Sequence, residues 1–142
     1  MTNSEKVSVP GLDDNAVILV VEDEVLVRFV TAEMLRDEGY VVLEAADASE
    51  ALALMATGHP LDLVLTDIRM PGELDGVGLT REIKQARPHL PILIVTSHLP
   101  EDGDHAGDGF LAKPFEHQQL LERVGEMIGS EWKQRRSSPR AS

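Results

Sequence analysis

Acidic side chains follow two apolar runs of the sequence at the point where each run ends. Glu22 and Asp23 come directly after AVILVV (16–21), and Asp67 follows LDLVLT (61–66), just before the turn sequence IRMPG. A carboxylate at the carboxyl end of a parallel strand lies where α/β proteins bind their ligands. This placement predicts one shared acidic site rather than three unrelated surface acids.

A hydroxyl group and an ammonium group follow two further apolar runs. Thr96 lies near the end of PILIVTS (91–97), and Lys113 comes directly after GFLA (109–112). Close carboxylates repel one another, and a hard divalent cation such as Mg²⁺ removes that repulsion while it keeps waters and a position for a phosphoryl oxygen. An aspartate carboxylate is a competent nucleophile toward phosphorus. Asp67 is therefore the candidate phosphoryl acceptor, with Lys113 and Thr96 as donors to the added anion.

The apolar pattern that must position these side chains alternates between continuous runs and helical spacing. Runs typical of buried strands lie at 16–21, 40–45, 61–66, 91–97 and 109–112. Apolar residues at helical spacing follow them, with Gly39, Gly58 and Pro88 as expected helix ends. The alternation predicts an α/β fold, in which helices cover both faces of a doubly wound, five-stranded parallel sheet.

The segment between the fourth and fifth runs departs from this pattern. It holds Pro100, Gly103 and Gly107, which disfavour a helix interior. We therefore expect helix 4, which should connect these two strands, to be shortened or irregular.

Length and composition favour one globular domain. The 142 residues include no cysteine, which excludes disulfides and thiolate metal sites, and the net charge of −12 disfavours direct contact with nucleic acid. Residues 1–14 are expected to form a flexible leader without a secretory signal, residues 15–129 the folded domain, and residues 130–142 a basic, disordered tail. With no apolar run of membrane-spanning length, the sequence favours a cytoplasmic protein that makes no membrane contact.

Four motifs together carry a family resemblance. ILVVEDE, LVLTDIRMPG, ILIVTS and FLAKPF, in this order and spacing, resemble the receiver domain of bacterial two-component response regulators over residues 16–128. The resemblance implies the flavodoxin-like strand order 2-1-3-4-5. It also implies a protein that receives a phosphoryl group from a sensor histidine kinase or a histidine phosphotransfer protein.

The resemblance also implies a metal site. Glu22 and Asp23 match the acidic pair that binds Mg²⁺, with Asp23 as the direct ligand and Mn²⁺ as an alternative ion. Asp67 matches the phosphoacceptor, which also contacts the metal, and the backbone carbonyl of Arg69 matches the third protein ligand.

Further positions match the family's switch. Thr96 corresponds to the hydroxyl that engages the phosphoryl group, and Phe110 to the aromatic residue that swings inward on activation. Lys113 corresponds to the family's lysine, whose bond to the following proline is expected to be cis. Arg69 and His98 occupy the two positions that help to set the lifetime of the phosphoryl group.

Three functions remain to be weighed. A stand-alone receiver that switches an unidentified output protein is favoured, because the residues after Ile128 are too few for a DNA-binding domain. A constitutive interaction module that keeps the fold is the alternative, suggested by the irregular helix 4. An aspartate-nucleophile phosphatase is disfavoured, because Arg69 stands where such enzymes carry their general acid. We therefore expect no turnover of a separate substrate, and the oligomeric state stays open.

Overall fold

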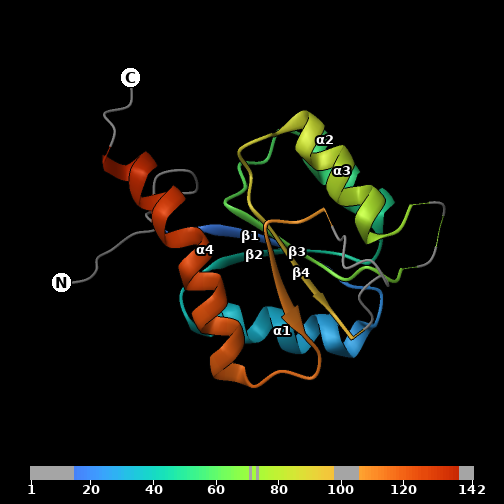
Figure 1. Cartoon of the computed structure of the whole chain (residues 1–142), viewed down its shortest axis with the longest axis horizontal. Helices are drawn as coiled ribbons and strands as arrows, with labels where there is room; N and C mark the ends of the chain where they lie inside the picture. Colours follow the sequence, from blue (N-terminus) through green and yellow to red (C-terminus); the bar gives the residue numbers. More distant parts are fainter. Residues whose placement is uncertain (1–14, 71, 73, 98–105, 138–142) are drawn as a thin grey trace.

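Five parallel strands form the centre of the protein, and helices cover both faces of the sheet (Figure 1). The structure, a computed structural model of the chain, describes residues 15–70, 72, 74–97 and 106–137. The strands are β1 (Val17–Val21), β2 (Val41–Ala45), β3 (Leu63–Thr66), β4 (Ile92–Thr96) and β5 (Gly109–Ala112). The helices are α1 (Val25–Asp37), α2 (Ala48–Ala56), α3 (Gly76–Ala86) and α4 (His117–Ser137).

The strand order is β2-β1-β3-β4-β5, and every neighbouring pair is parallel. This confirms the doubly wound α/β fold and the flavodoxin-like order. Figure 1 shows α1 and α4 on one side of the sheet and α2 and α3 on the other. In this topology the order changes direction between β1 and β3, so the crevice at their carboxyl ends is the preferred place for a ligand.

Each face of the sheet buries its own apolar cluster. Leu35 of α1 and Leu120 of α4 belong to one cluster, whereas Ala51 of α2 and Ile83 of α3 belong to the other. Successive side chains of a strand point to opposite faces. A continuous apolar run such as VILVV in β1 therefore serves both clusters, which explains why the strands lack polar alternation.

Local sequence signals fix where the helices begin and end. The side chains of Asp47 and Asp75 cap α2 and α3, and each accepts the backbone N–H of the residue three positions later at 2.9 Å. Gly39 and Gly58 follow the C-terminal ends of α1 and α2. Their φ angles of 102° and 82° lie in the left-handed region, which favours glycine.

Helix α4 is longer than the sequence suggested. It continues through residues 130–137, which we expected to belong to a disordered tail, so that expectation is wrong for these residues. The segment EWKQRRS contains mainly good helix formers, and extending an existing helix costs far less than starting a new one.

Two expectations fall outside the described residues. The leader at 1–14 is one. The other is the expected irregular helix between β4 and β5, most of which would lie at residues 98–105. Within the part of the chain that the structure describes, none of the helices has the length and apolar character needed to cross a membrane.

Candidate functional site

Three of the expected site residues continue the sheet by one position beyond the strand ends. Glu22 follows β1, Asp67 follows β3 and Lys113 follows β5. Their N–H groups donate to the carbonyls of Ala45 at 3.0 Å, Val21 at 3.4 Å and Thr96 at 3.0 Å, respectively. The ladder therefore fixes the backbone of each residue, and the side chains meet at one edge of the sheet.

Lys113 joins the two carboxylates. Its Nζ lies 2.8 Å from Oε1 of Glu22 and 2.7 Å from Oδ2 of Asp67. The side chains of Glu22 and Asp67 are only 8% and 12% exposed, and that of Lys113 is 21% exposed. Water therefore screens these ion pairs less than it screens surface pairs. The Lys113–Pro114 peptide bond is cis, which confirms the geometry expected for this lysine and proline.

The environment shifts the pKa values of Glu22 and Asp67 in opposite directions. Burial opposes the charge of Asp67, but hydrogen bonds from Lys113 and Thr96 outweigh it and hold the pKa of Asp67 below its ordinary value. Burial dominates at Glu22 and raises the pKa of that carboxyl despite the bond from Lys113. Burial likewise disfavours the charged ammonium of Lys113, yet its bonds to Asp67 and Glu22 raise its pKa. Asp67 is therefore the more readily ionised of the two carboxyl groups.

Two further groups approach Asp67. The Thr96 side chain, 1% exposed at the end of β4, hydrogen-bonds to its carboxylate. The backbone N–H of Arg69 donates to its Oδ1 at 3.2 Å, while the Arg69 side chain is exposed. Thr96 and Lys113 thus both contact the carboxylate at which an added anion is expected.

Three expected residues remain to be placed. Asp23 is exposed beside Glu22, and Phe110 lies half-buried in β5 against the apolar cluster of α2 and α3. His98 lies outside the described residues.

Gly76 is a site residue that the sequence reasoning missed. A Cβ atom there would lie 1.9 Å from the backbone oxygen of Asp67, and the Gly76 N–H donates to the carbonyl of Ile68 at 2.8 Å. The glycine thus lets the start of α3 pack directly on the backbone of Asp67. The signal in the sequence is the Asp75-Gly76 pair that follows the motif LVLTDIRMPG.

The comparisons with known proteins agree with this geometry. The response regulator receiver domain matches the chain over residues 18–125. The chain belongs to this receiver family.

Solved receivers have the same fold. The receiver domain of NtrX from Brucella abortus is 34% identical, with a TM-score of 0.73 over 80% of this chain and 98% of that one. A CheY-like receiver protein from Methanospirillum hungatei is 28% identical, with a TM-score of 0.78 over 84% of this chain and 98% of that one.

Curated relatives are longer than this receiver. The sensor kinase CckA of Brucella abortus is 39% identical over 82% of this chain but only 13% of its own length. The transcriptional regulatory protein PdtaR of Mycobacterium tuberculosis is 39% identical over 75% of this chain and 54% of its own length. This receiver therefore spans about half the length, or less, of these relatives.

Receiver domains are signalling modules that interact with sensor histidine kinases or phosphotransfer proteins and generally bind Mg²⁺ at the phosphorylation site. The donor chemistry here fits that ion. Glu22, Asp23 and Asp67 supply hard carboxylate oxygens, and Lys113 offsets only one of their three charges. Among the described residues, no three acidic or imidazole side chains stand close enough to enclose a metal by themselves.

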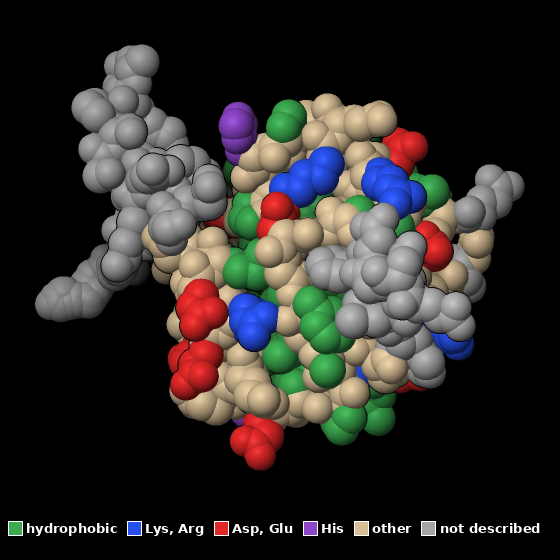
Figure 2. Space-filling view, viewed as in Figure 1, with side chains coloured by type: hydrophobic (Ala, Val, Ile, Leu, Met, Phe, Trp, Pro, Cys, Tyr) green, Lys and Arg blue, Asp and Glu red, His purple; other side chains and the backbone are tan. Residues whose placement is uncertain are grey.

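An apolar groove of about 700 Å³ adjoins the site. Its walls combine α1 with the segment after β5, and its lining includes Leu26, Val30, Met34, Lys113 and Phe115. Figure 2 shows hydrophobic side chains at the surface over the N-terminal end of α1, at the lower right of the view. The exposed members on α1 are Val25, Leu26, Phe29 and Val30, at 69%, 72%, 53% and 45% exposure. Such a patch marks a contact surface rather than an ordinary helix face.

Proposed function

We propose that this receiver accepts a phosphoryl group on Asp67 from a phosphohistidine and thereby switches the binding of an output protein. The observation that carries the proposal is the shared ammonium of Lys113, which bonds both Asp67 and Glu22 at the sheet edge. An aspartate with this much positive charge beside it stays ionised and can attack phosphorus.

The transfer balances without a further reactant. A carboxylate oxygen of Asp67 forms a bond to phosphorus as the bond from phosphorus to the donor imidazole nitrogen breaks, and the electron pair stays on the imidazole. Bound Mg²⁺ supplies charge neutralisation for the phosphoryl oxygens. Lys113 offers its ammonium and Thr96 its hydroxyl to the added anion, and these two bonds would replace the ones they now make with the bare carboxylate.

The metal would be held by oxygens of Glu22, Asp23, Asp67 and the Arg69 carbonyl. Movement of Thr96 toward the phosphoryl group would make room for Phe110 to turn inward. Arg69 and His98 would set the lifetime of the phosphoryl group. We further propose that the protein is a cytoplasmic receiver that turns over no separate substrate.

The phosphodonor is proposed to dock in the groove beside α1. A donor must bring its imidazole to Asp67, and Lys113 lies both in the lining of this groove and in contact with Asp67. A helix of the donor that buries an apolar stripe on Leu26 and Val30 would therefore end beside the acceptor. Fully burying such side chains contributes about 1.5–3 kcal/mol each, so a few contacts suffice for a transient complex.

Small-molecule phosphodonors test the proposal without a kinase. Incubation with acetyl phosphate and Mg²⁺ should add one phosphoryl group by intact mass, and Asp67→Asn should add none. Addition that persists in Asp67→Asn, or no addition to the wild type, would end the proposal. If an output partner binds the wild type, Asp67→Asn and the beryllofluoride-loaded protein equally, a constitutive interaction module replaces the switch.

A further inference from the structure

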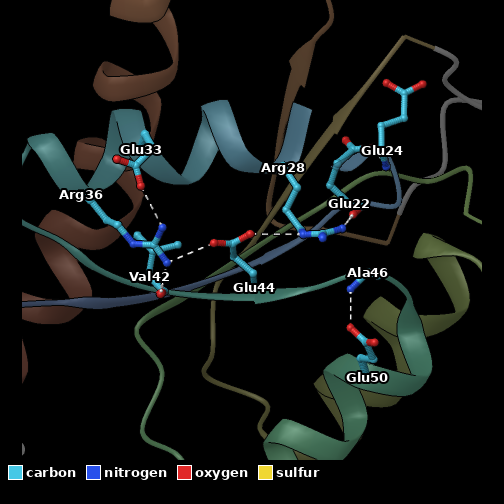
Figure 3. A network of polar contacts seen from close by, with 9 residues as sticks. All are labelled: Glu22, Glu24, Arg28, Glu33, Arg36, Val42, Glu44, Ala46 and Glu50. Atoms are coloured by element: carbon cyan, nitrogen blue, oxygen red, sulfur yellow. Dashed lines mark hydrogen bonds and ion pairs between the residues drawn. The ribbon is translucent and has the colours of Figure 1, made fainter. Parts of the chain in front are cut away.

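Two arginines of α1 share one glutamate of β2 (Figure 3). Nε of Arg28 lies 3.2 Å from Oε1 of Glu44, and Nη2 of Arg36 lies 3.1 Å from Oε2 of the same carboxylate. The Arg28 side chain is only 17% exposed, whereas that of Arg36 is 38% exposed. The network thus fixes α1 against the edge strand of the sheet, with Arg28 as its more buried member.

Arg28 makes one contact that Arg36 lacks. Its Nη1 donates to the backbone carbonyl of Glu22 at 2.7 Å, and Glu44 orients the guanidinium for this bond from the other side. Glu22 is the first residue of the acidic loop, which we define as residues 22–24. Arg28 therefore connects the acidic loop to both α1 and β2.

Backbone hydrogen bonds hold the two ends of the acidic loop: the Glu22 N–H donates to the Ala45 carbonyl at 3.0 Å, and the Glu24 carbonyl accepts from the Arg28 N–H at 2.9 Å. Glu24 occupies the N-cap position of α1, but its side chain makes no capping hydrogen bond. The N–H of Glu24 donates instead to Oε2 of Glu22 at 3.2 Å, a bond within the loop itself. Lys113 holds the carboxylate of Glu22 from the far side at 2.8 Å. The bond from Arg28 is thus the contact that fixes the Glu22 backbone to the first turn of the helix.

We propose that Arg28, oriented by Glu44, is a positioning residue that holds the acidic loop in the conformation that binds a divalent cation. By fixing the carbonyl of Glu22, it sets the direction of the Glu22 carboxylate and the start of the chain that presents Asp23. The inference rests on the proposed function, because the cation is the one that phosphorylation of Asp67 requires. Partners that orient metal-binding residues typically alter metal affinity by about 10–100-fold when they are removed.

The charge of Arg28 acts in the opposite direction to its positioning. A guanidinium near an acidic site repels an incoming cation, so loss of the charge alone would strengthen cation binding. Loss of the bond to Glu22 would weaken cation binding. The loop would then be ordered only when the cation binds, and this ordering would reduce the net binding free energy. The sign of the change in affinity therefore separates the two roles.

Arg36 provides the matched control. It bonds the same Glu44, and its other partners are Glu33 at 3.0 Å and the Val42 carbonyl at 2.9 Å, away from the acidic loop. Arg36→Met removes the same charge from the same helix and the same glutamate, but it leaves the bond to Glu22 in place. Arg28→Lys retains the charge with a shorter, single-headed donor that cannot serve Glu44 and Glu22 together.

The experiment measures Mg²⁺ binding to the unphosphorylated full chain by isothermal titration calorimetry. Arg28→Met should weaken the affinity about 10-fold, Arg28→Lys, which keeps the repelling charge without the oriented bond, should weaken it at least as much, and Arg36→Met should leave it within about two-fold of the wild type. Phosphorylation of Arg28→Met by acetyl phosphate should be slow at low Mg²⁺ and should recover toward the wild-type rate as Mg²⁺ is raised. A merely structural role would not be rescued by the ion.

Unchanged or tighter Mg²⁺ binding by a folded Arg28→Met would overturn the inference and leave Asp67 phosphorylation intact as a proposal. Equal weakening by Arg36→Met would also overturn it, because general loosening of α1 would then be the cause. If the wild type itself takes up no Mg²⁺, the proposed function fails first. Should Arg28→Met not fold, Glu44→Gln, which leaves Arg28 in place but loosens its orientation, should weaken binding while it keeps the thermal midpoint near that of the wild type.

Discussion

Gly76 lies so close to Asp67 that a Cβ atom on the glycine would sit 1.9 Å from the aspartate's backbone oxygen. The same glycine donates its N–H to the carbonyl of Ile68 at 2.8 Å. The first turn of α3 therefore packs on the backbone of Asp67 itself, and the position of this aspartate depends on a residue that has no side chain.

Replacing Gly76 with alanine should destabilise the fold and slow phosphorylation. The nearest neighbours of the added methyl group are backbone atoms of Asp67 and Ile68, which cannot rotate aside. Overpacking of this kind costs about 1–3 kcal/mol, and displacement of Asp67 from Lys113 should lower the rate with acetyl phosphate as well. Urea denaturation measures the first effect, and intact mass over time measures the second.

Gly125→Ala is the matched control for this substitution. Gly125 lies in α4, and beyond the backbone of its own helix and its chain neighbours a Cβ atom there would meet no atom within 4 Å. Alanine should therefore stabilise the protein by about 0.5–1 kcal/mol through its higher helix propensity, without a change in phosphorylation. If Gly76→Ala behaved like Gly125→Ala, the close packing of α3 on Asp67 would be wrong.

Removing the ammonium that Glu22 and Asp67 share should make stability depend on Mg²⁺. In Lys113→Met the two buried carboxylates would face each other without a counter-charge, at a cost of about 2 kcal/mol or several degrees in the thermal midpoint. Added Mg²⁺ should raise the midpoint of the variant more than that of the wild type, because the ion restores the missing positive charge. Thermal melts with and without Mg²⁺ measure both effects; a variant as stable as the wild type in chelator would contradict them.

The pH dependence of stability should reveal the cost of burying Glu22. Burial raises the pKa of Glu22 in the folded state, so between the unfolded value of about 4.3 and the higher folded value the native protein binds more protons. Stability contributed by this group is therefore lost as pH rises through that window and is fully lost above the folded pKa.

Glu22→Gln should accordingly gain stability relative to the wild type at pH 7, and the gain should disappear near pH 4. It should also weaken Mg²⁺ binding, since a neutral amide replaces a carboxylate. Urea midpoints between pH 4 and pH 8 measure the difference, with exposed Glu126→Gln as the comparison. A gain that is constant across this range would show that burial of the charge is not the cause.

Strand ends were predictable from the sequence because apolar runs in a parallel sheet stop at one edge. That rule brought Glu22, Asp67, Thr96 and Lys113 together before any coordinates, and the structure places all four there. The motif FLAKPF likewise predicted the cis bond before Pro114.

Contacts that depend on the approach of one element to another were not predictable. The contact of Gly76 with Asp67 depends on how closely α3 packs, and the bond from Arg28 to the Glu22 carbonyl needs the orientation that Glu44 provides. The helical backbone at 130–137 has a different cause: the segment is basic and polar, which is typical of a disordered tail, but it also contains good helix formers that extend α4.

Docking of the phosphodonor beside α1 predicts that two routes of phosphorylation can be separated. Leu26 is 72% exposed and lines the groove that leads to Lys113, but it takes no part in the bonds at Asp67. Leu26→Glu should therefore lower the rate of transfer from a phosphorylated histidine kinase by about 10-fold or more, because a buried charge would replace an apolar contact. Its rate with acetyl phosphate should stay close to that of the wild type.

Val41→Glu supplies the control, because Val41 is also an exposed apolar residue, at 37%, but it begins β2 at the edge of the sheet opposite β5. This variant should accept phosphoryl groups from both donors at the wild-type rate. Equal loss of transfer in both variants would indicate a general effect of added negative charge on the encounter with the donor. Loss of the acetyl phosphate reaction in Leu26→Glu would instead mean that the substitution disturbs the acidic loop, and the groove would no longer be the docking surface. The geometry of α1 and Lys113 requires that Leu26→Glu alone loses transfer from the kinase. Both variants should keep the wild-type rate with acetyl phosphate.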